Sequence, residues 1–291
     1  MNHAPLAWPD APPERIIAYQ GVPGAYSNLA CRERFPELVA APCPSFEDAF
    51  AAVREGRANR AMIPVDNSVA GRVADVHHLM PHSGLHIVGE HFLRVNHQLL
   101  GLRGARLETI RSVESHVHAL GQCRNFLRKH KLAAVVAADT AGAAADVAMR
   151  GDPTRAAIAS TLAAEIYDLQ ILASDIEDAA HNTTRFLILS REPERAAPHG
   201  AAVVTTFVFR VRNVPAALYK ALGGFATNGI NMVKLESYVD GAFVQAQFYA
   251  DVMAHPDEHR LQLAFEELNF FAHDVQILGV YPADPFRLGL A

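Results

Sequence analysis

Residues 181–189 have the sequence His181-Asn182-Thr183-Thr184-Arg185-Phe186-Leu187-Ile188-Leu189, in which a polar cluster leads directly into an apolar run. The apolar half predicts a strand that is buried on both faces. A rigid strand holds a reactive group still. An arginine guanidinium can bind a carboxylate through two parallel hydrogen bonds. A threonine hydroxyl can donate a hydrogen bond to a departing oxygen. From residue types alone, a polar strand start with a threonine as a local cap is the commoner case.

Length and composition limit the number of domains, the class of partner and the state of the cysteines. With 291 residues, half of them hydrophobic, the chain can form one large or two modest domains around a substantial core. The formal net charge of −5 and the absence of a basic cluster argue against a nucleic-acid partner. Three cysteines (Cys31, Cys43 and Cys123) lie outside any CxxC spacing, which predicts free thiols in a reducing compartment.

No membrane or export signal is expected. The proline-rich start, Met1 to Glu14, carries no apolar segment of the secretory type, and no apolar run in the chain reaches transmembrane length. The sequence therefore predicts a soluble, cytoplasmic protein.

Short apolar segments alternate with amphipathic ones through the first two thirds of the chain. Strands are expected at 16–19, 60–65, 133–137, 156–159 and 186–189. Helices are expected from about Ser27, after Ser45 as a cap, after 112–116, from Asp139 and over 160–167. This alternation predicts mostly parallel sheets. A long apolar segment at 85–95 indicates the crossing from one lobe to a second.

Two polar clusters follow predicted strands. The first, Gln20-Gly21-Val22-Pro23-Gly24-Ala25-Tyr26-Ser27, is a glycine turn before a helix, which points backbone N–H groups at an anion. A tight turn needs glycine for steric reasons anyway, and this one is not a nucleotide motif. The second cluster, Asp66-Asn67-Ser68, is either a helix cap or a ligand-facing crevice at the end of a strand.

Metal and nucleophile chemistry are not indicated. Histidines cluster at His77, His78, His82 and His86, and again at His116 and His118, without a zinc-type spacing. Ser27, Ser68 and Ser115 lack the context of a nucleophilic serine. No metal and no cofactor is therefore expected.

The last third of the chain has a different pattern. Residues 191–202 are rich in proline and glycine and indicate a linker. Beyond it, strands are expected at 203–211, 230–238, 243–249 and 275–280, and helices after Pro215 and over 255–271. Asp240-Gly241 is a hairpin signal. The order βαββαβ over 203–282 predicts an α+β, ferredoxin-like domain.

Five motifs resemble those of prephenate dehydratases, in the same order. They are G-x-x-G-x-Y-S at 21–27, P-x-E-N-S-x-x-G-x-V at 64–73, S-H-x-x-A-L-x-Q-C at 115–123, T-A-x-A-A at 140–144 and N-x-T-R-F at 182–186. Asp66 stands where glutamate is usual. The C-terminal part resembles the ACT regulatory domain through Gly229-Ile230-Asn231 and Glu236-Ser237. The resemblance implies a catalytic domain at 15–190, with two lobes like a periplasmic binding protein and crossings near 96 and 181.

The activity that the resemblance implies is a hydro-lyase reaction, the conversion of prephenate to phenylpyruvate, carbon dioxide and water in phenylalanine biosynthesis. It implies a catalytic role for Thr184, Asp66, Asn67 and Ser68. It implies substrate contacts for Gly24, Ala25, Ser27, Ser115, His116, Thr140, Thr183, Arg185 and Phe186. Because a carboxylate repels a bound dianion, Asp66 is expected to orient an arginine or backbone N–H groups. An arogenate dehydratase and a non-catalytic amino-acid sensor stay open as alternatives.

The resemblance also implies feedback inhibition by phenylalanine and a homodimer or tetramer. The residues that would bind phenylalanine are Asn213, Ala216, Ala217, Leu218, Asn231, Glu236 and Ser237. Ala216 or Ala217 stands where glycine is usual, and Tyr238 where arginine is usual, so an altered affinity is expected. Alternatively, this domain only holds an oligomer together.

Overall fold

The computed structural model describes residues 7–198, 201–239 and 246–289. The chain divides into two compact units. The first comprises Met1–Val73 and Phe92–Phe186, and the second comprises Ala74–His91 and Leu187–Ala291. Two of the three boundaries between the units therefore fall within strands, β5 (His86–Arg94) and β11 (Thr183–Ser190), and the third falls between Val73 and Ala74.

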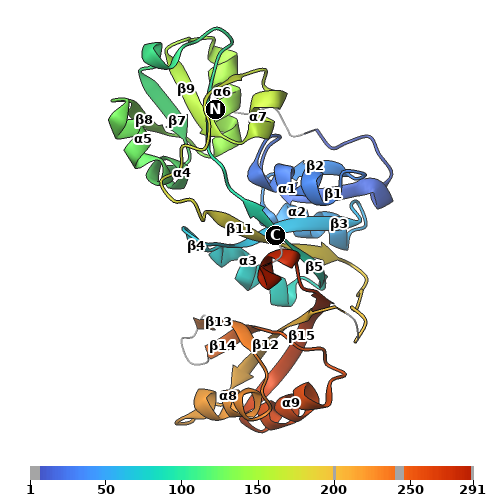
Figure 1. The fold of residues 1–291 in the computed structure, drawn as a ribbon. Helices are drawn as coiled ribbons and strands as arrows, with labels where there is room; N and C mark the ends of the chain where they lie inside the picture. Colours follow the sequence, from blue (N-terminus) through green and yellow to red (C-terminus); the bar gives the residue numbers. More distant parts are fainter. Residues whose placement is uncertain (1–6, 199–200, 240–245, 290–291) are drawn as a thin grey trace. The chain divides into compact units, whose positions relative to one another are not determined.

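The first lobe of the first unit is a small parallel sheet covered by helices (Figure 1). Strand β1 (Ile16–Gln20) pairs in parallel with β2 (Val39–Cys43) and β3 (Arg60–Asn67). Helix α1 (Tyr26–Arg34) follows the glycine turn, and α2 (Phe46–Arg54) begins where the Ser45 hydroxyl accepts the Asp48 N–H, as predicted. A short 3-10 helix, η1 (Pro13–Arg15), precedes β1.

The polar cluster at 66–68 lies in a hairpin. Strand β3 runs on to Asn67 and then pairs with the two-residue strand β4 (Gly71–Arg72). The next helix, α3 (Ala74–Leu79), begins only after that hairpin. The alternative in which these residues cap a helix is therefore wrong.

The second lobe is a mixed sheet in the order β10-β6-β9-β7-β8. Its strands are β6 (Gln98–Gly101), β7 (Ser112–Ser115), β8 (Ala133–Val136), β9 (Arg155–Ala159) and β10 (Gln170–Ala173). Its helices are α4 (Val117–Gln122), α5 (Arg124–Lys129), α6 (Thr140–Arg150), α7 (Thr161–Ile166) and the 3-10 turn η3 (Leu107–Thr109). Strand β7 is parallel to β8 and β9, whereas β6 is antiparallel to β9 and β10.

Some predictions for this lobe are confirmed and others are wrong. Strands β8 and β9 and helices α6 and α7 are confirmed. Mostly parallel pairing holds for only part of the sheet. Residues 112–115 form a strand, β7, and the helix expected after them is interrupted at Cys123. Strand β10 was not predicted.

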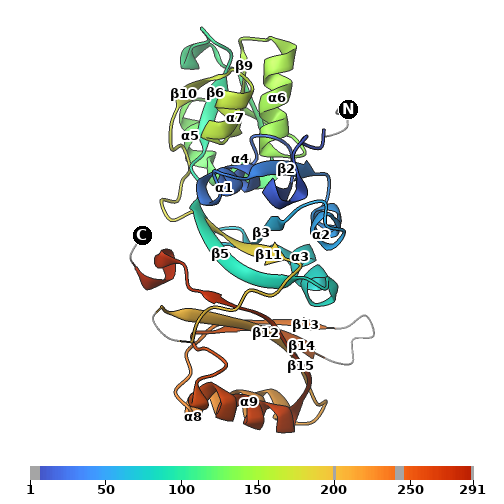
Figure 2. The same cartoon turned by 90° about the vertical axis from the view of Figure 1, so that its right-hand side faces the viewer.

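The second unit contains the predicted βαββαβ order. Its elements are β12 (Val203–Val211), α8 (Ala217–Thr227), β13 (Met232–Val239), β14 (Ala246–Val252), α9 (His259–Phe271) and β15 (Ala272–Pro282). The antiparallel strands lie in the order β13-β14-β12-β15, with α8 and α9 on one face (Figure 2). Phe207, Phe209, Phe225, Leu261 and Leu268 form the core between helices and sheet. The Asp240-Gly241 turn lies outside the described residues.

Helix α9 starts four residues later than predicted. His255 and Pro256 form a turn that closes when the Glu258 N–H donates to the His255 carbonyl. The Glu258 carboxylate in turn accepts the His255 N–H at 2.7 Å. These local bonds hold 255–258 outside the helix.

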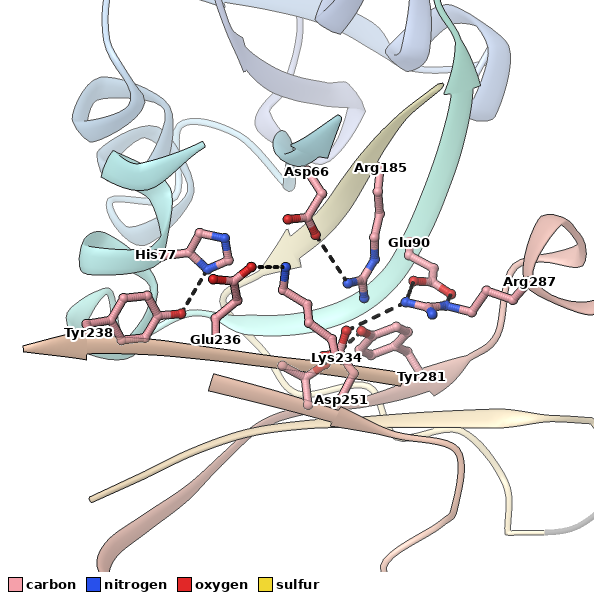
Figure 3. A network of polar contacts seen from close by, with 11 residues as sticks. Asp66, His77, Glu90, Arg185, Lys234, Glu236, Tyr238, Asp251, Tyr281 and Arg287 are labelled. Carbon is pink, nitrogen blue, oxygen red and sulfur yellow. Dashed lines mark hydrogen bonds and ion pairs between the residues drawn. The ribbon is translucent and has the colours of Figure 1, made fainter. Parts of the chain in front are cut away.

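Polar groups cover the other face of this sheet within the second unit (Figure 3). The Tyr238 hydroxyl lies 3.1 Å from His77 Nδ1 on α3, and the His77 ring meets Tyr249 edge-on. From the 3-10 turn η4 (Pro285–Leu288), Arg287 pairs with the buried carboxylates of Glu90 and Asp251. A second 3-10 turn, η2 (Met80–His82), follows α3.

The three cysteines are free and buried, as predicted. Burial raises the pKa of the Cys43 thiol to about 11 and the pKa values of Cys31 and Cys123 further. These thiols stay protonated near neutrality and are poor nucleophiles. No helix in the described part of the chain combines the length and apolar composition that crossing a membrane requires.

Candidate active site

A cavity of about 400 Å³ opens in the first unit and is lined by both lobes. One wall is made by the glycine turn and the start of α1, the β3–β4 hairpin and the first half of β11. The other wall is made by the starts of α4 and α6. Of the predicted site residues, those that line the cavity are Ala25, Ser27, Asn67, His116, Thr140, Thr184 and Phe186.

The Thr184 hydroxyl is held at this wall by an amide of fixed orientation. Asn67 Nδ2 donates to Thr184 Oγ1 at 2.9 Å. Asn67 Oδ1 accepts the backbone N–H groups of Val69 at 3.0 Å and Ala70 at 2.7 Å, so the amide cannot be turned around. Because Thr184 Oγ1 accepts from Asn67, its own proton is available to a molecule in the cavity.

Helix starts supply N–H groups at the cavity. Helix α1 begins after Ala25, which has no side-chain cap, and Ser27 in its first turn lines the cavity. Helix α6 begins at Thr140, where the Asp139 carboxylate accepts only the Gly142 N–H, at 2.6 Å. Helix N-termini favour anions. Among the described lining residues none is lysine or arginine, so an anion here would depend on N–H groups, hydroxyls and imidazoles.

Two histidines of the cavity, His97 and His116, have pKa values below the usual 6.5 and are therefore mostly neutral near pH 7. Partial burial lowers the pKa of His116, and the neighbouring His118 lowers it further, against a smaller opposing effect of Asp139. Burial likewise lowers the pKa of His97. Neutral imidazoles offer one donor and one acceptor each. Within the described residues no group of three or more His, Cys, Asp or Glu side chains is placed to hold a metal ion.

The other six predicted site residues do not line the cavity; they are Gly24, Asp66, Ser68, Ser115, Thr183 and Arg185. Ser115 is buried and donates to the Ile158 carbonyl at 2.6 Å. The Ser68 hydroxyl donates to the His181 carbonyl at 2.6 Å and accepts the Thr183 N–H at 2.9 Å, which fastens the hairpin to β11.

Gly24 lies against the second lobe. A Cβ atom on it would come within 2.9 Å of the Ala163 Cα, and its carbonyl accepts the Ser160 hydroxyl at 2.6 Å. Gly24 therefore permits a close approach between the two lobes of the first unit.

Arg185 points away from the cavity. Side chains alternate along a strand, so Thr184 and Phe186 face the cavity while Thr183 and Arg185 face the other side. The Arg185 guanidinium is 5% exposed and lies 3.8 Å from the Asp66 carboxylate (Figure 3). The expectation that Asp66 orients an arginine agrees with this pair. A direct grip of Arg185 on a ligand in this cavity has no geometric support.

Several lining residues were absent from the predicted site. Among them are Tyr26, His97, His118, Gln122 and Asp139. Tyr26 and Gln122 lie inside the quoted motifs, and His97 comes directly after the long apolar segment that ends one lobe. Position in a motif was therefore a usable signal for the first two. Nothing in the local sequence distinguishes His97 from the other histidines.

The residues predicted to bind an effector lie in the second unit. Asn213 and Ala216 are exposed before α8, and Ala216 has a left-handed φ of +60°, a conformation that favours glycine. Ala217 is buried, and Leu218 packs against the core. Asn231, directly before the edge strand β13, and Ser237, within it, are exposed. Glu236 pairs with Lys234 at 3.5 Å.

Comparison with known proteins identifies close relatives. Residues 17–194 match the family model for prephenate dehydratase. A protein of Komagataeibacter europaeus named bifunctional N-acyl-homoserine lactone acylase/prephenate dehydratase is 52% identical over 275 residues, 94% of this chain and 98% of its own. Arogenate dehydratase/prephenate dehydratase 1 of Arabidopsis thaliana is 41% identical over 286 residues, 93% of this chain and 73% of its own.

A solved structure shares the fold over nearly the whole chain. Prephenate dehydratase from Arthrobacter aurescens, in complex with L-Phe, superposes with a TM-score of 0.84 at 28% identity. The match covers 92% of this chain and 90% of that one.

Proposed function

Because the chain belongs to the prephenate dehydratase family, we propose that it converts prephenate to phenylpyruvate in the biosynthesis of phenylalanine. The observation that carries this choice is the Thr184 hydroxyl, which Asn67 holds at 2.9 Å with its proton available to the cavity. The proposal assigns no role to a metal or to a covalent nucleophile.

The reaction needs electrons to move in one direction across the ring. The bond from the ring to its carboxylate breaks, carbon dioxide leaves, and the electron pair moves into the ring as the hydroxyl at the opposite carbon departs. The product ring is aromatic, which supplies the driving force. A hydrogen bond from Thr184 to the departing oxygen strengthens as negative charge develops there. Proton uptake completes the departure as water.

The substrate's two carboxylates would be bound without arginine. The N-termini of α1 and α6 reach the cavity from opposite lobes, and Ser27, His116 and Thr140 offer further polar atoms. Backbone N–H groups are fixed donors that need no reorganisation during the reaction. We assign to Asp66 and Arg185 the support of the hairpin that carries Asn67.

Incubation of the purified protein with prephenate tests the proposal. We expect phenylpyruvate to form at a rate proportional to enzyme concentration. Arogenate carries an amino group where prephenate carries a keto group and would yield phenylalanine. We expect prephenate to have the higher kcat/KM, and a higher value for arogenate would make the protein an arogenate dehydratase. Turnover of neither substrate would favour a binding protein.

Feedback inhibition by phenylalanine is part of the proposal. The Arthrobacter aurescens relative was solved with L-Phe, and the exposed Asn213, Asn231 and Ser237 could bind an amino acid's charged ends in an oligomer. The alternative is a purely structural domain. Calorimetry with phenylalanine and a rate assay decide between them, since no heat and no inhibition at millimolar ligand would leave only the structural role.

Cytoplasmic location and a homodimer or tetramer remain predictions.

A second candidate activity is hydrolysis of N-acyl-homoserine lactones. The support is the relative at 52% identity whose name carries both activities, together with apolar cavity residues such as Val22, Pro44 and Val95 that could hold an acyl chain. Release of homoserine lactone from an acylated substrate is the test. If prephenate inhibits that release competitively, the two activities share this cavity.

A further inference from the structure

A continuous chain of side-chain hydrogen bonds starts at Thr184 and ends at Tyr26. It passes through Asn67, Asn182, Gln122 and His97. The five donor–acceptor distances are 2.9, 2.8, 3.1, 2.8 and 2.8 Å in that order. Asn182 and His97 are 1% and 2% exposed, so their bonds are shielded from solvent.

The direction of donation along this series of hydrogen bonds is fixed at one end. Two backbone N–H groups of the hairpin occupy Asn67 Oδ1, so Asn67 Nδ2 donates both to Thr184 Oγ1 and to Asn182 Oδ1. Asn182 must then donate through its Nδ2, and Gln122 must accept through its Oε1. Each amide inherits its orientation from the one before it.

The same polarity determines the tautomer of His97. Gln122 Oε1 is an acceptor, so the ring nitrogen 2.8 Å from it, Nε2, must carry a hydrogen. In the neutral ring, Nδ1 is then an acceptor. The single hydrogen of the Tyr26 hydroxyl has two acceptors within reach, Nδ1 at 2.8 Å and the Asn96 carbonyl oxygen at 3.0 Å. Burial raises the pKa of Tyr26 well above its usual value, so this hydroxyl keeps its proton.

With the opposite tautomer, two lone pairs or two NH₂ groups would face each other somewhere in this series of hydrogen bonds. With hydrogen on Nδ1, the Nε2 lone pair would face the lone pairs of Gln122 Oε1. Turning the Gln122 amide would set its NH₂ group against that of Asn182. Turning Asn182 as well would set two NH₂ groups together at Asn67, which the hairpin backbone holds in place.

We propose that His97 is a positioning residue for Thr184, acting as the Nε2–H tautomer through Gln122, Asn182 and Asn67. Its Nε2–H holds Gln122 in place, and through it Asn182, so that Asn67, whose orientation the hairpin fixes, keeps the position from which it donates to Thr184 Oγ1. The effect on turnover rests on the proposed function. The assignment of the tautomer does not rest on the proposed function, because the hydrogen bond between His97 Nε2 and Gln122 Oε1 determines it.

The first measurement is the tautomer itself, by ¹⁵N NMR of histidine-labelled protein without substrate. The sequence has 15 histidines, so the His97 signals are assigned as those missing from the His97→Gln variant. We expect hydrogen on Nε2 and none on Nδ1 near neutral pH. Hydrogen on Nδ1 alone would overturn the proposal, whether or not the protein turns over prephenate.

The second measurement compares two substitutions of His97. The amide nitrogen of glutamine reaches the position of Nε2, whereas that of asparagine reaches only the position of Nδ1. We therefore expect His97→Gln to keep most of kcat, and His97→Asn to lower kcat about tenfold or more through loss of the bond to Gln122, with KM changed less. Equal kcat in two variants of equal thermal stability would overturn the positioning role. Inactivity of the wild-type protein on prephenate would instead count against the proposed function.

Discussion

At the scale of single residues, the direction of each polar hydrogen decides what the cavity can do. Asn67 is a donor to Thr184 because two backbone N–H groups already occupy its oxygen. Thr184 and Arg185 are neighbours in sequence but face opposite sides of β11. The period of two along a strand predicts this separation, so the sequence alone was sufficient to exclude Arg185 from the cavity that Thr184 faces.

Substitutions of Asp66 test its pairing with Arg185. Asp66→Glu keeps a carboxylate near the guanidinium and should stay close to wild type in stability and turnover. Asp66→Ala removes a charged partner from a side chain that is 5% exposed. We expect it to lower the free energy of unfolding by about 1–3 kcal/mol, measured by urea denaturation. Equal midpoints for Asp66→Ala and wild type would refute the orienting role.

The pKa of His97 predicts a loss of stability in mild acid. Burial lowers this pKa in the folded protein from its usual 6.5. Above 6.5 the ring is neutral in both states. As the pH falls below 6.5, the unfolded chain binds a proton that the folded protein does not, so the free energy of unfolding falls until the folded pKa is reached.

Urea denaturation between pH 7.5 and pH 5 measures how steeply the free energy of unfolding falls with decreasing pH. His97→Gln removes the titrating group, so its free energy of unfolding should fall less steeply with decreasing pH than that of the wild type. Parallel curves for wild type and His97→Gln would contradict the prediction.

At the scale of elements, the strands and helices with an unbroken apolar run or a cap signal were predictable, and several elements without such a pattern were not. The buried runs of β1 and β11 and the capped helix α2 were found from apolar runs and a serine cap. Among the strands of four residues, β8 is an unbroken apolar run and was predicted, whereas polar residues break the run in β7 and precede it in β10, and both were missed. The β3–β4 hairpin was missed because its pairing depends on the Val73 N–H reaching the Val65 carbonyl, which no local pattern indicates.

The glycine turn before α1 offers a matched pair of substitutions. Gly24 and Gly104 both have positive φ, +88° and +83°, so alanine strains the backbone at either position. Only at Gly24 would the new Cβ also meet a neighbour, the Ala163 Cα at 2.9 Å. We expect Gly104→Ala to lower the free energy of unfolding by about 1 kcal/mol and to leave turnover unchanged.

Gly24→Ala should lower the free energy of unfolding further and also lower kcat/KM, because the shift it forces moves the wall that carries Ala25 and Ser27. The two variants are compared by thermal unfolding and by a rate assay. If they behave alike, the contact with Ala163 has no influence on the cavity.

At the scale of the whole molecule, the fold class and the βαββαβ order followed from the sequence, whereas the division into units did not. The boundaries of the two compact units fall between Val73 and Ala74 and inside β5 and β11, so Ala74–His91 belongs with the C-terminal elements. Within that unit, contacts between residues far apart in sequence fix the arrangement, such as Glu90 with Arg287. Local propensity carries no information on such pairs.

Arg287 provides the test of this arrangement. Its guanidinium lies 2.6 Å from Glu90 and 3.6 Å from Asp251, whose side chains are fully buried. Arg287→Ala leaves two buried carboxylates without this partner, and we expect a loss of about 3–5 kcal/mol in the free energy of unfolding. Arg103→Ala, from an exposed pair with Asp168, should lower the free energy of unfolding far less, because solvent screens that pair. Urea denaturation compares them, and similar costs would refute the account.

The most direct test of the central claim is the rate of phenylpyruvate formation from prephenate by wild type and Thr184→Val. Valine keeps the shape of the side chain and removes the hydroxyl that Asn67 holds toward the cavity. We predict a fall in kcat of roughly a hundredfold or more, with an unchanged melting temperature and with Thr227→Val, on α8, as active as wild type. A Thr184→Val variant that turns over prephenate at the wild-type rate would contradict the role assigned to this hydroxyl.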